Sequence, residues 1–355
     1  MPSIIKNIFK ILSVLIALCL VLSASVFAFF NYFNSPPDPP VAVHRDDLGM
    51  RIEKNQLYIE VRNGESALSV GQRLEEAGVI RSQYLWHFLS RIKNEFIKTG
   101  TYCIDLPATQ LSIHSILVSG DQMLIRVTIP EGVTLKKTAR VLEAAGICTE
   151  DEFLMAASSA QMRQRYGIPG QTMEGYLFPD TYLFPLAYPA ELVAAAMADN
   201  FFRRLEQLCP EASAIDAKEL NDRIILASIV EREYRIDAEA AVMAGVFFNR
   251  INRGMALQSC ATVEYVITEI LGRPHPAVLY NRDIEIQNPY NTYIWSGLPP
   301  GPISAPGAVA ISAVFNPFPS DYLYFRLTDA GAGSHYFSRT FDDHIQAGAL
   351  YTKGN

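Results

Sequence analysis

The sequence predicts an α+β protein with one N-terminal transmembrane helix, a small α/β subdomain and a larger α+β domain. Three observations support this fold class. An uncharged apolar stretch lies near the N-terminus, a strand-and-helix pattern occurs twice, and the C-terminal half combines apolar helices with short strands and proline-rich loops. A chain of 355 residues, 49% of them hydrophobic, is long enough for two or three domains.

The N-terminal helix is predicted to cross a membrane. No charged residue occurs from Ile11 to Phe30, and a stretch of that length spans the hydrocarbon core of a bilayer. Lys6 and Lys10 precede it, whereas the next basic residue is Arg45, so we expect a cytoplasmic N-terminus. The predicted segments are a cytoplasmic tail (1–10), a transmembrane helix (11–33) and a proline-rich linker (34–50).

A cleaved signal peptide is the alternative, with Val26-Phe27-Ala28 as a cleavage site. The apolar core of a signal peptide usually spans only about 7–15 residues, so a retained anchor is the preferred interpretation.

Charge and cysteine spacing exclude several classes of protein. The formal net charge of −7 argues against a nucleic-acid-binding protein, which would need a basic face. Cys103, Cys148, Cys209 and Cys260 are widely scattered and lack metal-ligand spacing. His335 and His344 likewise form no H-E-x-x-H or comparable motif, so we expect neither a metal nor a cofactor.

A repeat follows the linker. Residues 63–80 match residues 131–148, with shared glycine, leucine, glutamate and alanine positions. Each copy follows an alternating strand and contains a short amphipathic helix. A glycine stops this helix, as is typical of a helix C-terminus. The strands are predicted at 57–61 and 124–129, and the terminating glycines are Gly78 and Gly146. We therefore predict a repeat-containing subdomain over 51–150, followed by a second domain over 151–355.

The C-terminal half is predicted to contain helices at 190–208, 219–234 and 240–251. Pro179 and Pro185 interrupt the aromatic segment at 173–185, so it cannot form a long helix. The aromatic side chains of this segment either pack in the core or stack on sugar rings, and core packing is the preferred reading. They are Tyr176, Phe178, Tyr182 and Phe184.

Two glutamates at the end of an apolar helix are candidate catalytic acids. Residues 224–230 carry no charge, so their helix should be buried on most sides. Desolvation where this run ends would raise the pKa of Glu231 and allow it to act as a general acid. Glu233 lies about 200° away around the helix, and both stripes are largely apolar. A solvated helix end, with Glu231 paired to Arg235, explains the segment equally well.

Several blocks around this helix carry a family resemblance. They are EGYLFPDTYLF (174–184), VFFNRINRGMALQSCATVEY (246–265), YNTYIWSGLPPGPISAPGAVAISAVFNP (290–317) and DYLYFRLTDAGAGSHYFSRTFDDH (321–344). In this order they resemble the endolytic murein transglycosylase (YceG-like) family, whose members cut the glycan strands of peptidoglycan. The resemblance extends from about Leu57 to the C-terminal end, and the block at 290–317 is specific.

The resemblance implies a lytic transglycosylase that cleaves the MurNAc-GlcNAc bond within new glycan strands and limits their length. Glu231, the first acid of the I-V-E-x-E pattern, is the implied catalytic residue, and the C6 hydroxyl of N-acetylmuramic acid (MurNAc) is the implied nucleophile. A LysM-like fold is implied for 51–150. The resemblance also implies an inner-membrane location with a periplasmic catalytic domain, and peptidoglycan synthases (penicillin-binding proteins) as partners.

Motif positions identify candidate substrate-binding residues. These are Gln258, Tyr290, Asn291, Tyr293 and Arg250. Arg250 either faces an anionic group of the substrate or complements its helix dipole. The family usually reads L-Q-T-D-P-T where this chain has Cys260-Ala261 in place of Asp-Pro. An acidic residue is therefore missing from this position.

Two alternatives remain open at this stage. The first alternative to a lytic transglycosylase is a non-catalytic cell-wall binding or scaffold protein. The second is a muramidase-type hydrolase in which Glu233 or another acid is the second carboxylate. A serine hydrolase is disfavoured because the sequence contains no G-x-S-x-G motif.

Overall fold

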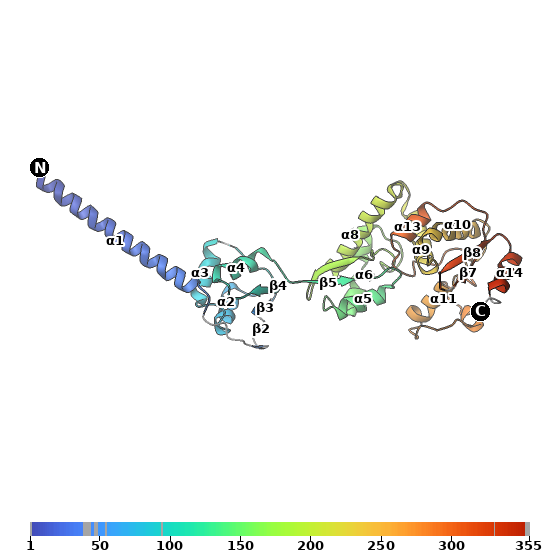
Figure 1. Cartoon of the computed structure of the whole chain (residues 1–355), viewed down its shortest axis with the longest axis horizontal. Coiled ribbons are helices and arrows are strands. Elements are labelled where there is room, and N and C mark those ends of the chain that lie inside the picture. The colour runs from blue at the N-terminus through green and yellow to red at the C-terminus, as the bar shows by residue number, and fades with distance from the viewer. Residues whose placement is uncertain are drawn as a thin grey trace. The chain divides into compact units, whose positions relative to one another are not determined.

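The computed structural model describes residues 2–37, 44–45, 49–53, 55–93, 95–329 and 331–351 (Figure 1). It divides into two compact units, Met1–Leu124 and Ile125–Asn355. This division differs from the one predicted after residue 150. The second repeat copy packs in the C-terminal unit, where Leu135 and Leu142 share a core with Ile224. Most of the predicted linker at 34–50 lies outside the described residues.

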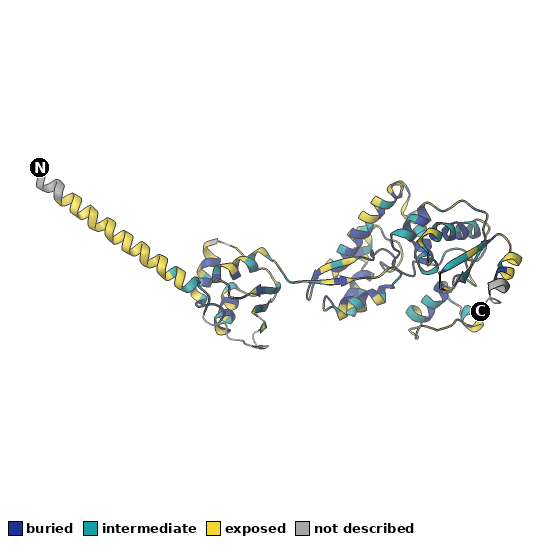
Figure 2. Ribbon diagram, in the orientation of Figure 1, coloured by how far each residue is buried: buried dark blue, intermediate teal, exposed yellow. Residues whose placement is uncertain are grey.

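Helix α1 (Pro2–Asn34) contains the predicted membrane-spanning stretch. From Asn7 to Asn34 it is long and apolar enough to cross a bilayer, and Figure 2 shows it exposed along almost its whole length. An exposed apolar helix of this length fits a single-pass membrane anchor. Directly after α1, the carbonyls of Ser35 (3.3 Å) and Pro36 (2.9 Å) accept hydrogen bonds from Arg81 of the same unit.

The N-terminal unit contains an antiparallel sheet of strand order β1-β2-β3-β4. Leu57 and Ile59 of β3 share a core with Leu74 of α2, Trp86 of α3 and Leu117 of α4, so one sheet face is covered by helices. The elements after α1 are β1 (His44–Arg45), β2 (Met50–Glu53), β3 (Gln56–Val61), α2 (Ala67–Glu76), α3 (Gln83–Lys93), β4 (Gly100–Asp105) and α4 (Gln110–Ser119).

The two repeat copies form the predicted strand, turn and helix. Ser66 and Thr134 cap α2 and α5 by accepting hydrogen bonds from backbone N–H groups of the first turn. Gly78 and Gly146 follow these helices with φ angles of 68° and 71°, a conformation that glycine adopts without steric cost. The prediction that these glycines end the helices is therefore confirmed.

The C-terminal unit surrounds one large core with helices, and it includes a small β5–β6 sheet and the β7–β8 hairpin. Its first elements are β5 (Leu124–Thr128), α5 (Leu135–Ala144), α6 (Glu150–Ser158), α7 (Ala160–Tyr166), β6 (Thr181–Pro185), α8 (Ala190–Leu208) and the 3-10 helix η2 (Pro210–Ala214). Then follow α9 (Ala217–Glu233), α10 (Asp237–Asn252), α11 (Cys260–Tyr265), the π-helix η3 (Val266–Ile270), α12 (Asn281–Ile284), α13 (Ala308–Phe315), β7 (Tyr324–Asp329), β8 (Ser334–Ser338) and α14 (Phe341–Tyr351).

Helix α9 lies at the centre of this unit and packs against α10, α11 and α13. Asp216 caps its start by accepting a hydrogen bond from the N–H of Glu219 at 2.8 Å. All residues from Ile224 to Val230 are buried, as their apolar character predicts. The buried run stops at Val230, so Glu231 is the first residue after this run that is only partly buried.

The aromatic segment before α8 packs in the core. Tyr176, Phe178 and Phe184 are at most 5% exposed, and Tyr182 is partly buried beside them. The prediction of core packing is confirmed for these side chains, since they are not available as an open sugar-stacking surface.

Candidate active site

Glu231 is half-buried at the C-terminal end of α9. One carboxyl oxygen, Oε2, accepts a hydrogen bond from the backbone N–H of Gly307 at 2.9 Å. The pKa of Glu231 is raised to about 7, mainly by burial and also by the negative charge of Glu131, against the lowering effect of the Gly307 hydrogen bond. A glutamate with this pKa is substantially protonated near neutral pH, which is the requirement for a general acid.

The segment that supplies Gly307 is docked onto α9 by Ser228. The Ser228 hydroxyl accepts from the N–H of Ile303 (3.0 Å), and its carbonyl accepts from the Ser304 hydroxyl (2.9 Å). Ala305 also pairs with the start of the second repeat copy: its N–H donates to the carbonyl of Val133 at 2.8 Å. These bonds fix the backbone donor at the Glu231 carboxyl.

Glu233 contacts a different part of the chain. Its carboxylate accepts a short hydrogen bond from the hydroxyl of Ser259, just before α11. Burial raises the pKa of Glu233 to about 7, although the Ser259 hydrogen bond lowers it. The next residue, Cys260, has its Sγ 3.2 Å from the hydroxyl of Tyr293. Glu233 therefore connects α9 to the loop that carries Gln258, whereas Glu231 faces Gly307.

Gln258 has an exposed side chain and a left-handed backbone, with φ of 51°. Its N–H donates to the carbonyl of Thr292 at 3.0 Å, and the N–H of Ser259 donates to the Thr292 hydroxyl at 3.1 Å. Thr262 completes the group, with its hydroxyl 2.9 Å from that of Thr292. A non-glycine residue in this conformation is strained, and such strain is common at functional sites.

Tyr290, Asn291 and Tyr293 lie in one loop but differ in their surroundings. Tyr290 is partly buried and its ring packs at 5.1 Å from that of Tyr265. Asn291 is fully buried, and its amide donates to the carbonyls of Ile284 and Ile286, both at 2.9 Å. The loop as folded leaves the Asn291 side chain no direct access to a sugar.

Arg250 is also buried, at 7% exposed. Its guanidinium donates to the carbonyls of Leu323 (2.6 Å), Leu257 (2.7 Å) and Ala256 (3.3 Å). It therefore joins α10 to the Gln258 loop and to the start of β7. These bonds direct its Nε–H and Nη1–H donors at the protein backbone.

Glu174 is a buried carboxyl that the sequence did not single out as a site residue. Both of its oxygens lie 2.9 Å from the N–H of Leu135, at the start of α5. Burial raises the pKa of Glu174 to about 8, and the negative charge of Glu269 contributes, against lowering by the Leu135 and Tyr265 hydrogen bonds. The glutamate was visible in EGYLFPDTY, but its burial depends on segments distant in sequence.

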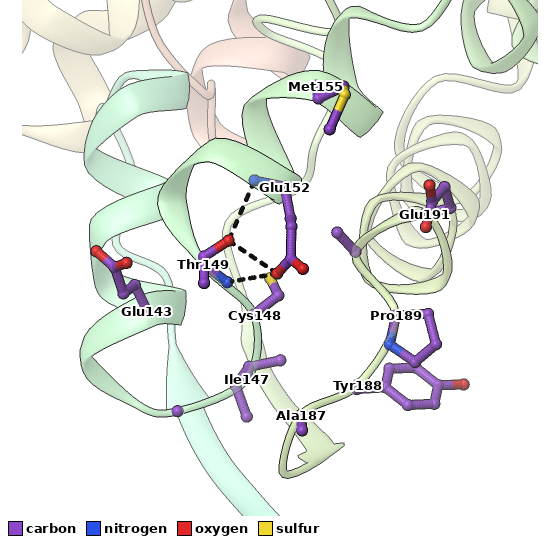
Figure 3. A pocket seen from close by; sticks show the side chains of 12 residues that line it. Glu143, Ile147, Cys148, Thr149, Glu152, Met155, Ala187, Tyr188, Pro189 and Glu191 are labelled. Carbon is purple, nitrogen blue, oxygen red and sulfur yellow. Dashed lines mark hydrogen bonds between the residues drawn. The ribbon is translucent and has the colours of Figure 1, made fainter. Parts of the chain in front are cut away.

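A cavity of about 620 Å³ lies elsewhere in the C-terminal unit, between the α5–α6 turn and the start of α8 (Figure 3). In its wall, Glu152 and Thr149 exchange hydrogen bonds. The residues that line it include neither Glu231 nor Glu233, so this cavity is not the candidate site.

Within the part of the chain that the structure describes, no group of three or more His, Cys, Asp and Glu side chains is arranged to hold a metal ion. Independently of this, the raised pKa and the Gly307 hydrogen bond of Glu231 support proton transfer by this carboxyl. This carboxyl can donate a proton, and the Gly307 N–H stabilises the carboxylate that remains.

Comparisons with known proteins identify the family of this chain. The YceG-like family model matches residues 59–349. The chain is 29% identical over 321 residues to an endolytic murein transglycosylase of Streptococcus pneumoniae, covering 82% of this chain and 57% of that relative. It thus spans little more than half the length of the pneumococcal relative. A Bacillus subtilis protein of the same name is 27% identical over 322 residues, covering 84% of this chain and 85% of the relative.

A solved structure also resembles this chain. The crystal structure of a YceG-like protein from Listeria monocytogenes superposes with a TM-score of 0.56 and 28% sequence identity. The match covers 83% of this chain and 99% of that chain.

Proposed function

Because the chain belongs to the YceG-like family, we propose that it is an endolytic peptidoglycan transglycosylase with Glu231 as its acid and base. The observation that carries the proposal is the position of Glu231. It is half-buried at the end of an apolar helix, and its pKa is raised to about 7. The relatives in Streptococcus pneumoniae and Bacillus subtilis carry the name endolytic murein transglycosylase, which supports the same reaction class.

The proposed reaction uses one carboxyl group twice. Protonated Glu231 donates its proton to the glycosidic oxygen as the bond between MurNAc C1 and that oxygen breaks. The Glu231 carboxylate then accepts the proton of the MurNAc C6 hydroxyl while the C6 oxygen bonds to C1. The products are a 1,6-anhydro-MurNAc end and a new free hydroxyl on the leaving sugar. Water is not consumed, and the attacking hydroxyl is already part of the substrate, which favours the reaction through proximity.

The candidate substrate residues divide into two proposed roles. Gln258 directly precedes Ser259, the hydrogen-bond partner of Glu233, and Tyr293 contacts the next residue, Cys260. Both side chains are partly or fully exposed, so we assign them to sugar binding. Tyr290, partly buried against Tyr265, is assigned to the same surface. Asn291 and Arg250 bond backbone carbonyls, which supports a role in holding the loops.

The N-terminal parts are proposed to place this site near the membrane. We propose that α1 is a single-pass anchor in the inner membrane, with a cytoplasmic N-terminus and a periplasmic catalytic unit. The β3–α2–α3–β4 order of the N-terminal unit supports a LysM-like module that positions glycan. Cutting beside the membrane would act on new strands and limit their length, with peptidoglycan synthases as partners.

The test uses the full-length chain in detergent and purified peptidoglycan. We expect anhydro-muropeptides by mass spectrometry, together with a fall in mean glycan-strand length that shows internal cuts. Reducing MurNAc ends would instead establish a muramidase-type hydrolase. Binding to peptidoglycan without any new ends would support the scaffold alternative.

A further inference from the structure

Two glutamates meet at Gly307, the residue that precedes α13. The N–H of Gly307 donates to Glu231 Oε2 at 2.9 Å. On its other side, the Glu131 side chain fills the space that a Cβ at Gly307 would occupy. Gly307 has φ of −82° and ψ of −177°, a conformation open to any residue. The backbone conformation therefore does not require glycine at position 307. The space that the missing side chain leaves is what allows Glu131 to lie there.

The turn that follows Glu131 is fixed at two points. The N–H of Gly132 donates to the carbonyl of Ala305 at 2.9 Å, which pairs the two segments that carry Glu131 and Gly307. Four residues beyond Glu131, the N–H of Leu135 is bound by the Glu174 carboxyl. A Cβ added to Gly132 would lie 3.6 Å from Cγ of Glu231, so this turn also touches the candidate acid.

The other charged and titratable groups around Glu231 come from three elements. Tyr234 follows it at the end of α9 and hydrogen-bonds it, and Asp237 at the start of α10 adds a second negative charge. Arg232, the adjacent cation, pairs with Glu264 at 2.8 Å. Glu131 itself is exposed, and its charge acts on Glu231.

We propose that Glu131 is a second carboxylate of the active site, a positioning residue that acts through Glu231 by holding the proton on it. This inference rests on the proposed function. A negative charge beside a half-buried carboxyl disfavours a second negative charge, so Glu231 keeps its proton until it donates to the glycosidic oxygen. The raised pKa of Glu231, to which Glu131 contributes, agrees with this role.

The repeat supports the same inference. In the alignment of the two copies, Glu131 corresponds to Asn63, while the following glycine is shared. The copy that lies beside Glu231 is therefore the one that carries a charge at this position. A purely structural turn would not require that difference.

The experiment measures the pH profile of anhydro-muropeptide release by the full-length chain in detergent at low ionic strength. In Glu131→Gln, the alkaline limb should move to lower pH by about half a unit or more, with rates on the acid side within about twofold of the parent. Glu131→Asp retains the charge, so its alkaline limb should lie close to the pH at which the parent's limb lies. Glu143→Gln, an equal charge change at an exposed position of α5, should match the parent.

A Glu131→Gln profile identical to that of the parent, or a rate lowered equally at all pH values, would overturn the proposal. If Glu131→Gln failed to fold, Glu131→Asn, which copies the first repeat, makes the same test. Reducing ends from the parent would refute the lytic function while leaving the pH comparison valid, because hydrolysis also needs the acid. If the parent released no ends, NMR of ¹³C-labelled glutamate carboxyls would replace the activity measurement. The Glu231 signal is the one that Glu231→Gln removes, and its pKa should be lower in Glu131→Gln than in the parent.

Discussion

The carboxyl of Glu231 accepts a hydrogen bond from the N–H of Gly307, 76 residues later in the chain, at 2.9 Å. Burial at the end of α9 favours the protonated carboxyl, while this donor, at the start of α13, favours the carboxylate. Together with the neighbouring negative charges, these effects leave the pKa of Glu231 at about 7, where one group can both give and accept a proton. An acid and base that is used twice needs this balance.

Replacing Gly307 with alanine tests how closely Glu131 approaches. The Cβ of Gly307→Ala would overlap the outer atoms of the exposed Glu131 side chain and force it into another rotamer, so we expect a loss of about 0.5–1.5 kcal/mol in the free energy of unfolding. Thermal unfolding measures the loss. In a Glu131→Ala background the same substitution should cost much less, because its clash has been removed. Equal costs in both backgrounds would show that Glu131 does not lie against Gly307.

Gln258 offers a matched pair of substitutions. Gln258→Ala and Gln258→Gly both remove the side chain, and we expect both to lower the cleavage rate by about tenfold or more if it positions the sugar. Only glycine relieves the backbone strain at φ of 51°, so Gln258→Gly should be about 0.5–1 kcal/mol more stable than Gln258→Ala. Cleavage at the parent rate by both variants would remove Gln258 from the substrate surface.

Arg250→Lys is expected to destabilise the fold. A lysine ammonium cannot replace the planar guanidinium that bonds Leu323 and Leu257, so the free energy of unfolding should fall by about 2–3 kcal/mol. The same change at exposed Arg253 should stay within about 0.5 kcal/mol of the parent. A stable Arg250→Lys protein with weakened peptidoglycan binding would return Arg250 to the substrate-binding residues.

Glu174 should make stability depend on pH. Its pKa is raised from 4.5 to about 8 by burial, so the folded state binds the proton more tightly than the unfolded state. Its contribution to stability is complete below about pH 4.5 and is lost as the pH rises through about 8, by on the order of a few kcal/mol. Glu174→Gln should show a smaller fall in melting temperature from pH 5 to pH 9. Parallel curves for the two proteins would contradict this account.

Long helices were the most predictable part of the fold. The helix predicted at 190–208 has those bounds, and α9 and α10 differ from prediction by three residues or fewer at either end. Their long apolar runs and clear boundaries account for this. Local sequence signals also operate at the C-terminal end, where Thr340 caps α14 by accepting a hydrogen bond from the N–H of Asp343 at 3.2 Å.

The domain boundary could not be predicted because similarity between repeat copies does not reveal which core each copy joins. The second copy contributes Leu135 and Leu142 to the C-terminal core, which moves the boundary to Leu124. The LysM-like fold stays a prediction.

The candidate site was only partly predictable. The abrupt end of an apolar run identified Glu231 and Glu233, but the loops that separate their roles come from residues 259 and 307. Motif position alone did not distinguish Asn291, whose amide bonds buried carbonyls, from an exposed side chain such as Gln258. The position of Glu131 could not be predicted from the sequence, because its side chain fits there only where residue 307 has no side chain.

The most direct test compares Glu231→Gln with the parent and with Glu233→Gln in the release of anhydro-muropeptides by the full-length chain, with circular dichroism to confirm folding. Glu231→Gln preserves shape but removes the proton donor, so we predict a loss of about 10²–10⁴-fold, while Glu233→Gln should retain far more activity. Release of anhydro ends by Glu231→Gln at close to the parent rate, or a loss confined to Glu233→Gln, would contradict the assignment of the chemistry to Glu231.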